Sequence, residues 1–368
     1  MAKKFIMVML TSLAVIFVIT GTAYMYKAGV FEPYPEPVYL DQEQSAERPV
    51  YSQLSKEEQA LYTTLYNGVR EQKTEIPLPY EIDGDTYTKL YCILEKQESD
   101  IFYMSSTFYT AEKIRKARMA YREIPGDIPA MEAELEKAVA EFADELSQLG
   151  DYEKALKIHD YIIEKCTYEI DYDDGLGATA YGCLMNGSSH CEGYAKAFDV
   201  LAKACGLESI VVTGVTDEGE NHAWNQVKIH GEWYNCDVTW DDTDTVDDLR
   251  HTYFLVEDES FTETHTADTE HFAPFACRAT ENTYFNKNDL YINNDECAEE
   301  IITREIEARN PQIELKFADK ELYEGFKERF VEGEEIFQII LASGVEGELT
   351  ISVTENEKEL CLMLTMPF

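Results

Sequence analysis

Basic residues are scarce in this sequence. It has 31 Lys and Arg against 72 Asp and Glu, which gives the 368-residue chain a formal net charge of −41. Such a surface repels the phosphates of nucleic acids and of anionic lipids. We therefore expect no nucleic-acid partner. Hydrophobic residues still make up 45% of the chain, which is enough for a folded core rather than a disordered chain.

Closely spaced cysteine pairs are also absent. None of the nine cysteines forms a CxxC pair, so nothing supports a zinc ribbon. Their number is odd and their spacing is scattered, so we expect most of them to be buried free thiols. An acidic run after residue 240 lacks the central glycine of an EF-hand loop, which favours a solvated loop over a calcium site. We expect no metal or other cofactor. The acidic run consists of Asp241, Asp242, Asp244, Asp247 and Asp248.

Charges are missing from one long stretch near the N-terminus. Phe5–Tyr24 is an apolar run of about 20 residues, long enough to cross a bilayer core of about 30 Å. Lys3 and Lys4 precede it and favour a cytoplasmic N-terminus. We expect a single-pass membrane anchor within residues 1–30, with a cleaved signal peptide ending at Ala23 as the alternative. In both cases the rest of the chain lies outside the cytoplasm.

Composition and periodicity divide the remaining chain into four segments. Residues 31–54 are rich in Pro and Glu and predict an extended linker. We expect a small α+β segment over 55–125, a catalytic domain over 126–281 and a second small α+β segment over 282–368. The order of helices and strands in the last segment resembles that in the first. An internal duplication and two unrelated flanks remain alternatives.

Hydrophobic periodicity predicts the elements of these segments. Ser55 is expected to cap the first helix, and Glu58 to complete a capping box. Several short apolar runs predict strands. These runs are Ile101–Met104, Ala117–Tyr121, Thr252–Val256 and Ile336–Leu341.

The stretch Tyr181–Asp242 contains a candidate nucleophile. Cys191 follows a small polar loop and starts a predicted helix. Unsatisfied N–H groups at a helix N-terminus lower the pKa of a thiol, which favours a nucleophile over a buried core thiol. Gly193 is expected to allow close approach of another chain segment. His190 is interpreted as a loop residue, with modulation of the thiol as the alternative.

A β-hairpin supplies two further groups. His222 begins one strand, Asp237 lies in the next, and Gly231 makes the tight turn between them. Pairing across that turn brings His222 and Asp237 together as cross-strand neighbours. The carboxylate can then orient the imidazole that serves as base. An ordinary strand histidine and a solvent-facing aspartate are the alternatives.

Together these pieces resemble the catalytic core of the transglutaminase-like superfamily. The matching motifs occur in the order CEGYAKAF, VVTGV, HAWNQVKIHGEWYNCDVTWDD and HTYFLV. The resemblance implies an α+β, papain-like fold in which a helix bearing the cysteine packs on an antiparallel sheet bearing the histidine and aspartate. It further implies that Cys191 is the nucleophile, His222 the general base and acid, and Asp237 the residue that orients His222.

The resemblance also implies a thioester formed on an amide carbonyl, with an amine or water as the acyl acceptor. The backbone N–H of Cys191 would stabilise the oxyanion. Trp224, Trp240 and Tyr194 are expected to bind substrate. The alternative role of the tryptophans is packing in the core of the hairpin, and this role is preferred for Trp233.

The sequence therefore predicts a membrane-anchored, extracellular, transglutaminase-like cysteine enzyme. Its expected partners are protein or peptide substrates at the cell surface, which it would cross-link, deamidate or hydrolyse. One alternative is a cysteine peptidase or amidase acting on cell-wall peptides. Others are a non-catalytic binding module with the same fold and a structural role in spore or envelope assembly.

Overall fold

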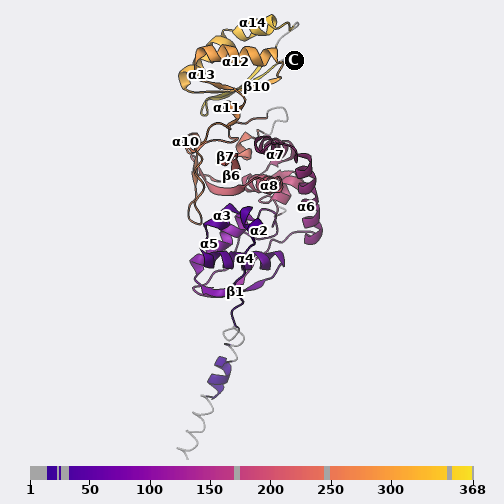
Figure 1. Ribbon diagram of the computed structural model, residues 1–368, viewed down its shortest axis with the longest axis vertical. Helices are drawn as coiled ribbons and strands as arrows, with labels where there is room; N and C mark the ends of the chain where they lie inside the picture. The colour runs from indigo at the N-terminus through magenta and orange to yellow at the C-terminus, as the bar shows by residue number, and fades with distance from the viewer. Residues whose placement is uncertain are drawn as a thin grey trace, which may run out of the picture.

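The computed structural model describes residues 15–22, 25, 33–169, 175–243, 249–345 and 350–366. Three α+β parts follow one another along the long axis of the molecule, with the C-terminal part at one end (Figure 1). Among the described residues, no helix has the length and apolar character needed to span a membrane. The predicted anchor at Phe5–Tyr24 falls largely outside those residues and stays a prediction.

The N-terminal part combines four helices with an antiparallel pair of strands. Ser55 accepts a hydrogen bond from the Glu58 N–H, and the Glu58 side chain accepts one from the Ser55 N–H, so the predicted capping box is confirmed. The elements are α2 Gln42–Ala46, α3 Pro49–Gln53, α4 Lys56–Arg70, β1 Glu75–Ile82, α5 Gly84–Gln97 and β2 Ile114–Arg118.

The extended linker predicted over residues 31–54 is wrong for its second half. That half forms α2 and α3, and several of its side chains belong to the main hydrophobic core. Asp41 caps α2, and Pro49 starts α3, where its missing N–H costs no hydrogen bond. The abundance of Pro and Glu concealed the apolar residues between them. The core residues of this half are Val50, Tyr51 and Leu54, and Leu40 just before α2 belongs to the same core.

The middle part contains the central sheet, with strand order β7-β6-β5-β8 and antiparallel pairing throughout. Helix α8 packs on this sheet, where Asn225 of β6 donates to the carbonyl of Ala195. The predicted α+β fold with a cysteine-bearing helix on an antiparallel sheet is therefore confirmed. The elements are α6 Ile128–Glu145, α7 Asp151–Lys165, β3 Thr167–Tyr168, η1 Gly182–Asn186, β4 Ser188–Ser189, α8 Cys191–Ala204, β5 Ser209–Thr216, β6 Asn221–Ile229, β7 Glu232–Cys236, α9 Val238–Asp241, α10 Asp258–Phe261 and β8 His265–Ala267.

The C-terminal part has a hydrophobic core of its own. Its sheet has the strand order β11-β12-β10-β9, with β9 and β10 parallel. Since the N-terminal sheet is a single antiparallel pair, the hypothesis of an internal duplication is wrong. The elements are α11 Tyr284–Lys287, β9 Tyr291–Ile292, α12 Asp295–Glu307, β10 Gln312–Phe317, α13 Lys320–Phe326, η2 Lys327–Glu332, α14 Glu335–Ala342, β11 Ser352–Asn356 and β12 Cys361–Thr365.

Three of the short predicted strands are wrong. Ile101–Met104 and Thr252–Val256 are buried turns that each make one isolated bridge to a neighbouring segment. Ile336–Leu341 lies within helix α14. Each is a brief apolar run, and periodicity alone does not separate a short strand from a buried turn or helix of that length. The run at Ala117–Tyr121 overlaps β2 only in part, because β2 ends at Arg118.

The packing around Gly193 gives a test of this architecture. A Cβ at this position would overlap Ser189 Oγ and lie 2.8 Å from the Gly177 carbonyl oxygen. We predict that Gly193→Ala lowers the free energy of unfolding by about 1–3 kcal/mol, because the site is already full. Urea denaturation measures the change. Gly325→Ala in α13 is the matched control.

At Gly325 no atom lies within 4 Å of the position a Cβ would take. Alanine should therefore raise the free energy of unfolding there by up to about 1 kcal/mol, because it is the better helix former. Equal effects of the two substitutions would show that α8 is not closely packed at Gly193.

Candidate active site

The three residues predicted to carry the chemistry meet at one end of the strands β6 and β7 of the central sheet. Cys191 is the first residue of α8, and His222 lies near the start of β6. Asp237 Oδ2 lies 2.6 Å from His222 Nε2. The connecting turn is the predicted one, with positive φ angles at His230 and Gly231.

The position of Asp237 requires a correction. It was predicted to lie in the second strand of the hairpin, but β7 ends at Cys236 and Asp237 is the N-cap of α9. The register of the hairpin, with Asn225 opposite Cys236, still brings the carboxylate to His222. Leaving the strand here lets the carboxylate also bind backbone N–H groups at the start of the helix.

Two imidazoles lower the pKa of the Cys191 thiol. Burial alone would raise this pKa, but hydrogen bonds from His190 and His222 and the positive charge of His222 outweigh burial and lower the pKa to about 7. Because His222 uses Nε2 for Asp237, Nδ1 is the nitrogen left for the thiol. The contact between His190 and Cys191 agrees with the alternative interpretation of His190 as a residue that modulates the thiol.

The His222 imidazole is held in its charged form. Burial would lower its pKa, but the negative charge of Asp237 and the hydrogen bonds to Asp237 and Cys191 raise it to about 10. A thiolate and an imidazolium can therefore coexist over a wide range of pH. That ion pair is the reactive form of a cysteine nucleophile with its general acid in place.

The Asp237 carboxylate is fully buried and accepts hydrogen bonds from four donors. Burial would raise its pKa, but the His222 charge and the hydrogen bonds from two imidazoles hold the pKa well below its usual range. Oδ2 lies 2.6 Å from His222 Nε2 and 3.1 Å from His265 Nε2. Oδ1 accepts from the N–H groups of Thr239, at 3.0 Å, and Trp240, at 3.3 Å.

Sequence reasoning missed His265, the second imidazole on Asp237. It lies at the start of β8, is buried, and stacks on Phe261 with a ring separation of 4.0 Å. Its Nδ1 lies 2.8 Å from Thr264 Oγ1. A three-residue strand gives no periodic signal, and the contact spans 28 residues of sequence. The role of His265 could therefore be recognised only from its contact with Asp237 in the folded structure.

The substrate-binding residues predicted from the resemblance lie in different surroundings. Tyr194 is fully buried, with its hydroxyl donating to Asp242 at 2.6 Å, so a substrate contact is wrong for it. Trp224 is buried between Phe261 and His265 and lies outside the lining of the Cys191 cavity. This position agrees with the alternative prediction for Trp224, in which it packs in the hairpin core rather than contacting substrate.

The other two tryptophans are half-buried. The Trp240 ring is tilted against the rings of His265 and His222, with centroid distances of 4.3 Å and 5.6 Å. Its substrate contact stays a prediction. Trp233, on β7 of the hairpin, stacks on Phe275 with a centroid distance of 4.1 Å. For this residue the sequence favoured packing in the hairpin core over substrate binding.

A cavity of about 570 Å³ opens beside Cys191 and His222. Its walls come from α8, β5, β6 and β8, and the N-terminal part adds Lys96 from α5. Lys96 Nζ lies 2.7 Å from a carboxylate oxygen of Glu192, the residue after the nucleophile. The same oxygen lies 2.9 Å from Lys196 Nζ in a second ion pair. The N-terminal segment is therefore part of the candidate active site.

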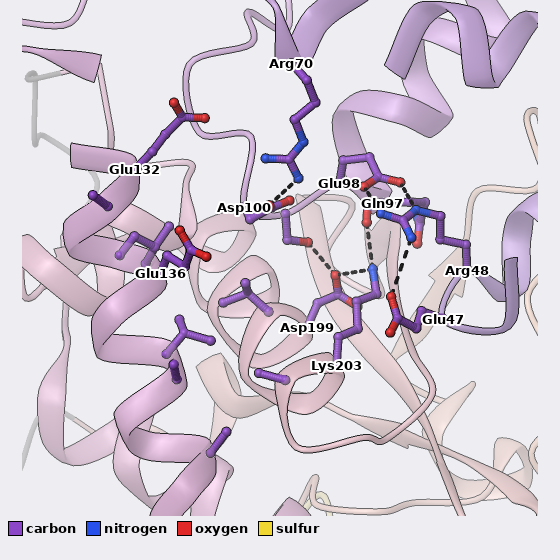
Figure 2. Close-up of a pocket in the computed structure, with 18 of the residues that line it drawn as sticks. Glu47, Arg48, Arg70, Gln97, Glu98, Asp100, Glu132, Glu136, Asp199 and Lys203 are labelled. Carbon is purple, nitrogen blue, oxygen red and sulfur yellow. Dashed lines mark hydrogen bonds and ion pairs between the residues drawn. The ribbon is translucent and has the colours of Figure 1, made fainter. Parts of the chain in front are cut away.

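A larger cavity of about 910 Å³ lies along the second half of α8, between α6 and the loop after α5 (Figure 2). Carboxylates from α6, among them Glu132 and Glu136, face it from one side. No cysteine or histidine lines it. Its lining cations are each paired with a carboxylate of the chain: Arg48 with Glu98, Arg70 with Asp100, and Lys203 with Asp199.

Two groups of histidine and aspartate within the described parts of the chain have ligand atoms close enough to share a metal ion. One is His222, Asp237 and His265. The other comprises His159, Asp160 and His251. Asp241 bonds His159 and is fully buried, so the solvated loop predicted for the acidic run is wrong at this residue. Asp244, Asp247 and Asp248 lie outside the described residues.

Comparisons with known proteins agree with this geometry. The family model of the transglutaminase-like superfamily matches residues 140–238. Kyphoscoliosis peptidase of Mus musculus is 25% identical over 192 residues, which cover 45% of this chain and 29% of that protein. The Homo sapiens protein of the same name is 26% identical with the same coverage. The match therefore spans under a third of these relatives' length.

Solved structures give weaker likenesses. The crystal structure of a TGase is 23% identical with a TM-score of 0.26, and covers 30% of this chain and 32% of that chain. The periplasmic domain of TgpA from Pseudomonas aeruginosa is 17% identical with a TM-score of 0.24, and covers 36% and 55%. Residues 140–238, which include Cys191, His222 and Asp237, therefore resemble the core of the transglutaminase-like superfamily.

Proposed function

We propose that this chain is a cysteine enzyme that forms a thioester on the amide carbonyls of protein or peptide substrates. The observation that carries the proposal is the chain of contacts from the Cys191 thiol through His222 to Asp237 at the wall of an open cavity. A non-catalytic module of the same fold has no need of a thiol whose pKa is lowered to about 7.

The arrangement supports a two-step acyl transfer. His222 takes the thiol proton, and the Cys191 thiolate attacks the amide carbonyl. The N–H of Cys191, at a helix N-terminus without an intrahelical acceptor, is placed to stabilise the oxyanion. The His222 imidazolium then protonates the leaving amine or ammonia. An amine or water next gives its proton to His222 and attacks the thioester, which frees the thiol.

Asp237 holds the ring of His222 in one orientation throughout. As a fully buried acceptor it fixes Nε2 as a donor, so Nδ1 remains the nitrogen that exchanges protons with sulfur and substrate. This chemistry uses residues of the chain alone and calls for no cofactor.

Hydrolysis is the second candidate outcome of the same acyl-enzyme step. The curated relatives carry the name peptidase, which favours water as the acceptor. Cell-wall peptides are one substrate class that such a peptidase or amidase would cleave. We further propose that the enzyme acts outside the cytoplasm, anchored through the apolar run Phe5–Tyr24.

The first test separates these outcomes. The purified full-length chain and a Cys191→Ala variant are incubated with a glutamine-containing peptide, with and without a primary amine. We predict that the wild type modifies or cleaves the peptide and that the variant shows no turnover. Mass spectrometry distinguishes amine incorporation, ammonia release and chain cleavage. Equal product from both proteins would refute a role for Cys191.

The pH dependence of thiol reactivity gives a second test. Thiolate forms above the thiol pKa, so alkylation of Cys191 by iodoacetamide should rise through a midpoint near pH 7. Burial raises the pKa of the Cys183 thiol well above the usual range, so this thiol should stay unreactive at that pH. Turnover needs the imidazolium as well and should fall as pH rises through about 10. Peptide mapping of the alkylated sites gives each rate, and a Cys191 midpoint above pH 8.5 would contradict the ion pair.

A third test concerns Asp237. Asp237→Asn keeps an oxygen for the α9 N–H groups but removes the negative charge that stabilises the His222 imidazolium. We predict that kcat/KM falls by about 100-fold or more and that the alkylation midpoint of Cys191 moves to higher pH. The exposed Asp295→Asn is the matched control and should change neither quantity. A normal rate in Asp237→Asn, with its fold verified by circular dichroism, would remove Asp237 from the mechanism.

A further inference from the structure

A second histidine–carboxylate cluster lies where the middle part meets the C-terminal part. His159 and Asp160 are neighbours on α7, and His251 lies in the segment that follows α9. His159 Nδ1 and His251 Nε2 each lie 3.1 Å from the same Asp160 oxygen, Oδ1. His159 is fully buried and His251 is buried. The mechanism proposed above uses none of these groups.

The outer nitrogen of each ring is held by a buried carboxylate. His159 Nε2 lies 3.1 Å from Asp241 Oδ2, and His251 Nδ1 lies 3.0 Å from Glu314 Oε2. A metal-binding histidine typically donates its second N–H to a carboxylate in this way, which fixes the tautomer and the ring. Both rings therefore turn one nitrogen inward, toward a shared aspartate oxygen.

We propose that His159, Asp160 and His251 bind one divalent transition-metal ion. One ligand atom of each residue lies within 4.8 Å of the others, so a small closure brings all three to about 2 Å from a common centre. Two imidazoles with one carboxylate suit Zn²⁺ or Fe²⁺. The set is poor for Ca²⁺, which takes oxygen ligands.

Hydrogen bonding alone accounts less well for the cluster. A neutral imidazole has a single N–H, and ionised carboxylates only accept. If the carboxylates stay ionised, filling all four contacts with hydrogen bonds requires both rings to be positively charged, although the rings stack with centroids 5.2 Å apart. A metal ion binds the two inner nitrogens as lone-pair donors and leaves one N–H for each outer carboxylate.

The cluster also has an entry path. Asp160, His251 and Glu314 line a cavity of about 530 Å³ between the middle and C-terminal parts. An ion can reach the inner ligand atoms from this cavity, and a fourth coordination position can remain open to water. The site is distinct from the cavity beside Cys191, whose lining shares no residue with it.

A bound ion would fasten the segment that supports the candidate active site. The Tyr253 carbonyl oxygen accepts a hydrogen bond from the Asp237 N–H at 3.0 Å, and the Tyr253 N–H donates one to the Asp241 carboxylate. Glu314, which holds His251, belongs to strand β10 of the C-terminal part. The ion therefore has a structural role, joining α7, the segment after α9 and the C-terminal sheet.

Zinc binding by the full-length chain tests the proposal. The chain carries Cys191→Ala in all samples so that this thiol does not compete for metal. We expect one Zn²⁺ per chain, measured by competition with a chromophoric chelator, and a rise in Tm when zinc is added to chelator-treated protein. Asp160→Asn should abolish both effects. Glu314→Gln, which loosens the ring of His251, should weaken zinc binding about 10- to 100-fold.

His265→Gln is the matched control, because it alters the other histidine–aspartate group and should leave zinc binding unchanged. Substituted Co²⁺ should show no thiolate-to-cobalt charge-transfer band, since the ligands are nitrogen and oxygen. Chelator-treated wild type and Asp160→Asn should unfold at similar temperatures. The proposal fails if Asp160→Asn binds zinc as the wild type does. It also fails if zinc does not change the wild-type Tm while Asp160→Asn lowers the Tm of the chelated protein, because the cluster is then a network of hydrogen bonds.

Discussion

The buried carboxylate of Asp237 is the constraint on which the candidate site depends. A carboxylate removed from water is strongly unfavourable unless charged or polar partners replace its hydration. Here the backbone supplies two partners and two imidazoles supply the others. The backbone donors exist only because β7 stops at Cys236 and a short helix begins at once. The end of β7 therefore determines where the Asp237 carboxylate and its hydrogen-bond donors lie.

The order of the remaining contacts follows from that fixed point. Asp237 Oδ2 lies 2.6 Å from His222 Nε2, and β6, which carries His222, is paired on both sides by β5 and β7. Helix α8, which begins at Cys191, is joined to the same strand by the hydrogen bond from Asn225 to the Ala195 carbonyl. The N-terminal part adds to this scaffold, since Gln97 donates to the Val211 carbonyl on β5 at 2.7 Å. Three segments far apart in sequence thus converge on one sheet.

Local signals explain what could be predicted from the sequence. Cys191 after a small polar loop, His222 near the head of an apolar strand and the Gly231 turn each depend on a few neighbouring residues. The capping box at Ser55 is a signal of the same kind. Such features are determined by backbone geometry and appear in the sequence directly.

Long-range contacts explain most of what could not be predicted. His265 gains its role from a partner 28 residues away, and Asp241, which looked like part of a solvated run, is buried because His159 lies opposite. Helix α14 was mistaken for a strand, because a run of six residues, five of them apolar, shows no decisive period. Helix α3 was hidden by composition, since it is stabilised by the packing of Val50 and Tyr51 in the core rather than by propensity.

Several buried carboxylates of this acidic chain have histidine as a partner. The sequence has seven histidines. Four of them are buried against carboxylates: His159, His222, His251 and His265. A planar ring with two nitrogens on opposite edges can meet two partners at once, which an ammonium at the end of a flexible stem does with less fixed geometry. Each of these rings therefore joins two segments of chain. The same property that lets His222 link a thiol to Asp237 lets His251 link Asp160 to the C-terminal sheet.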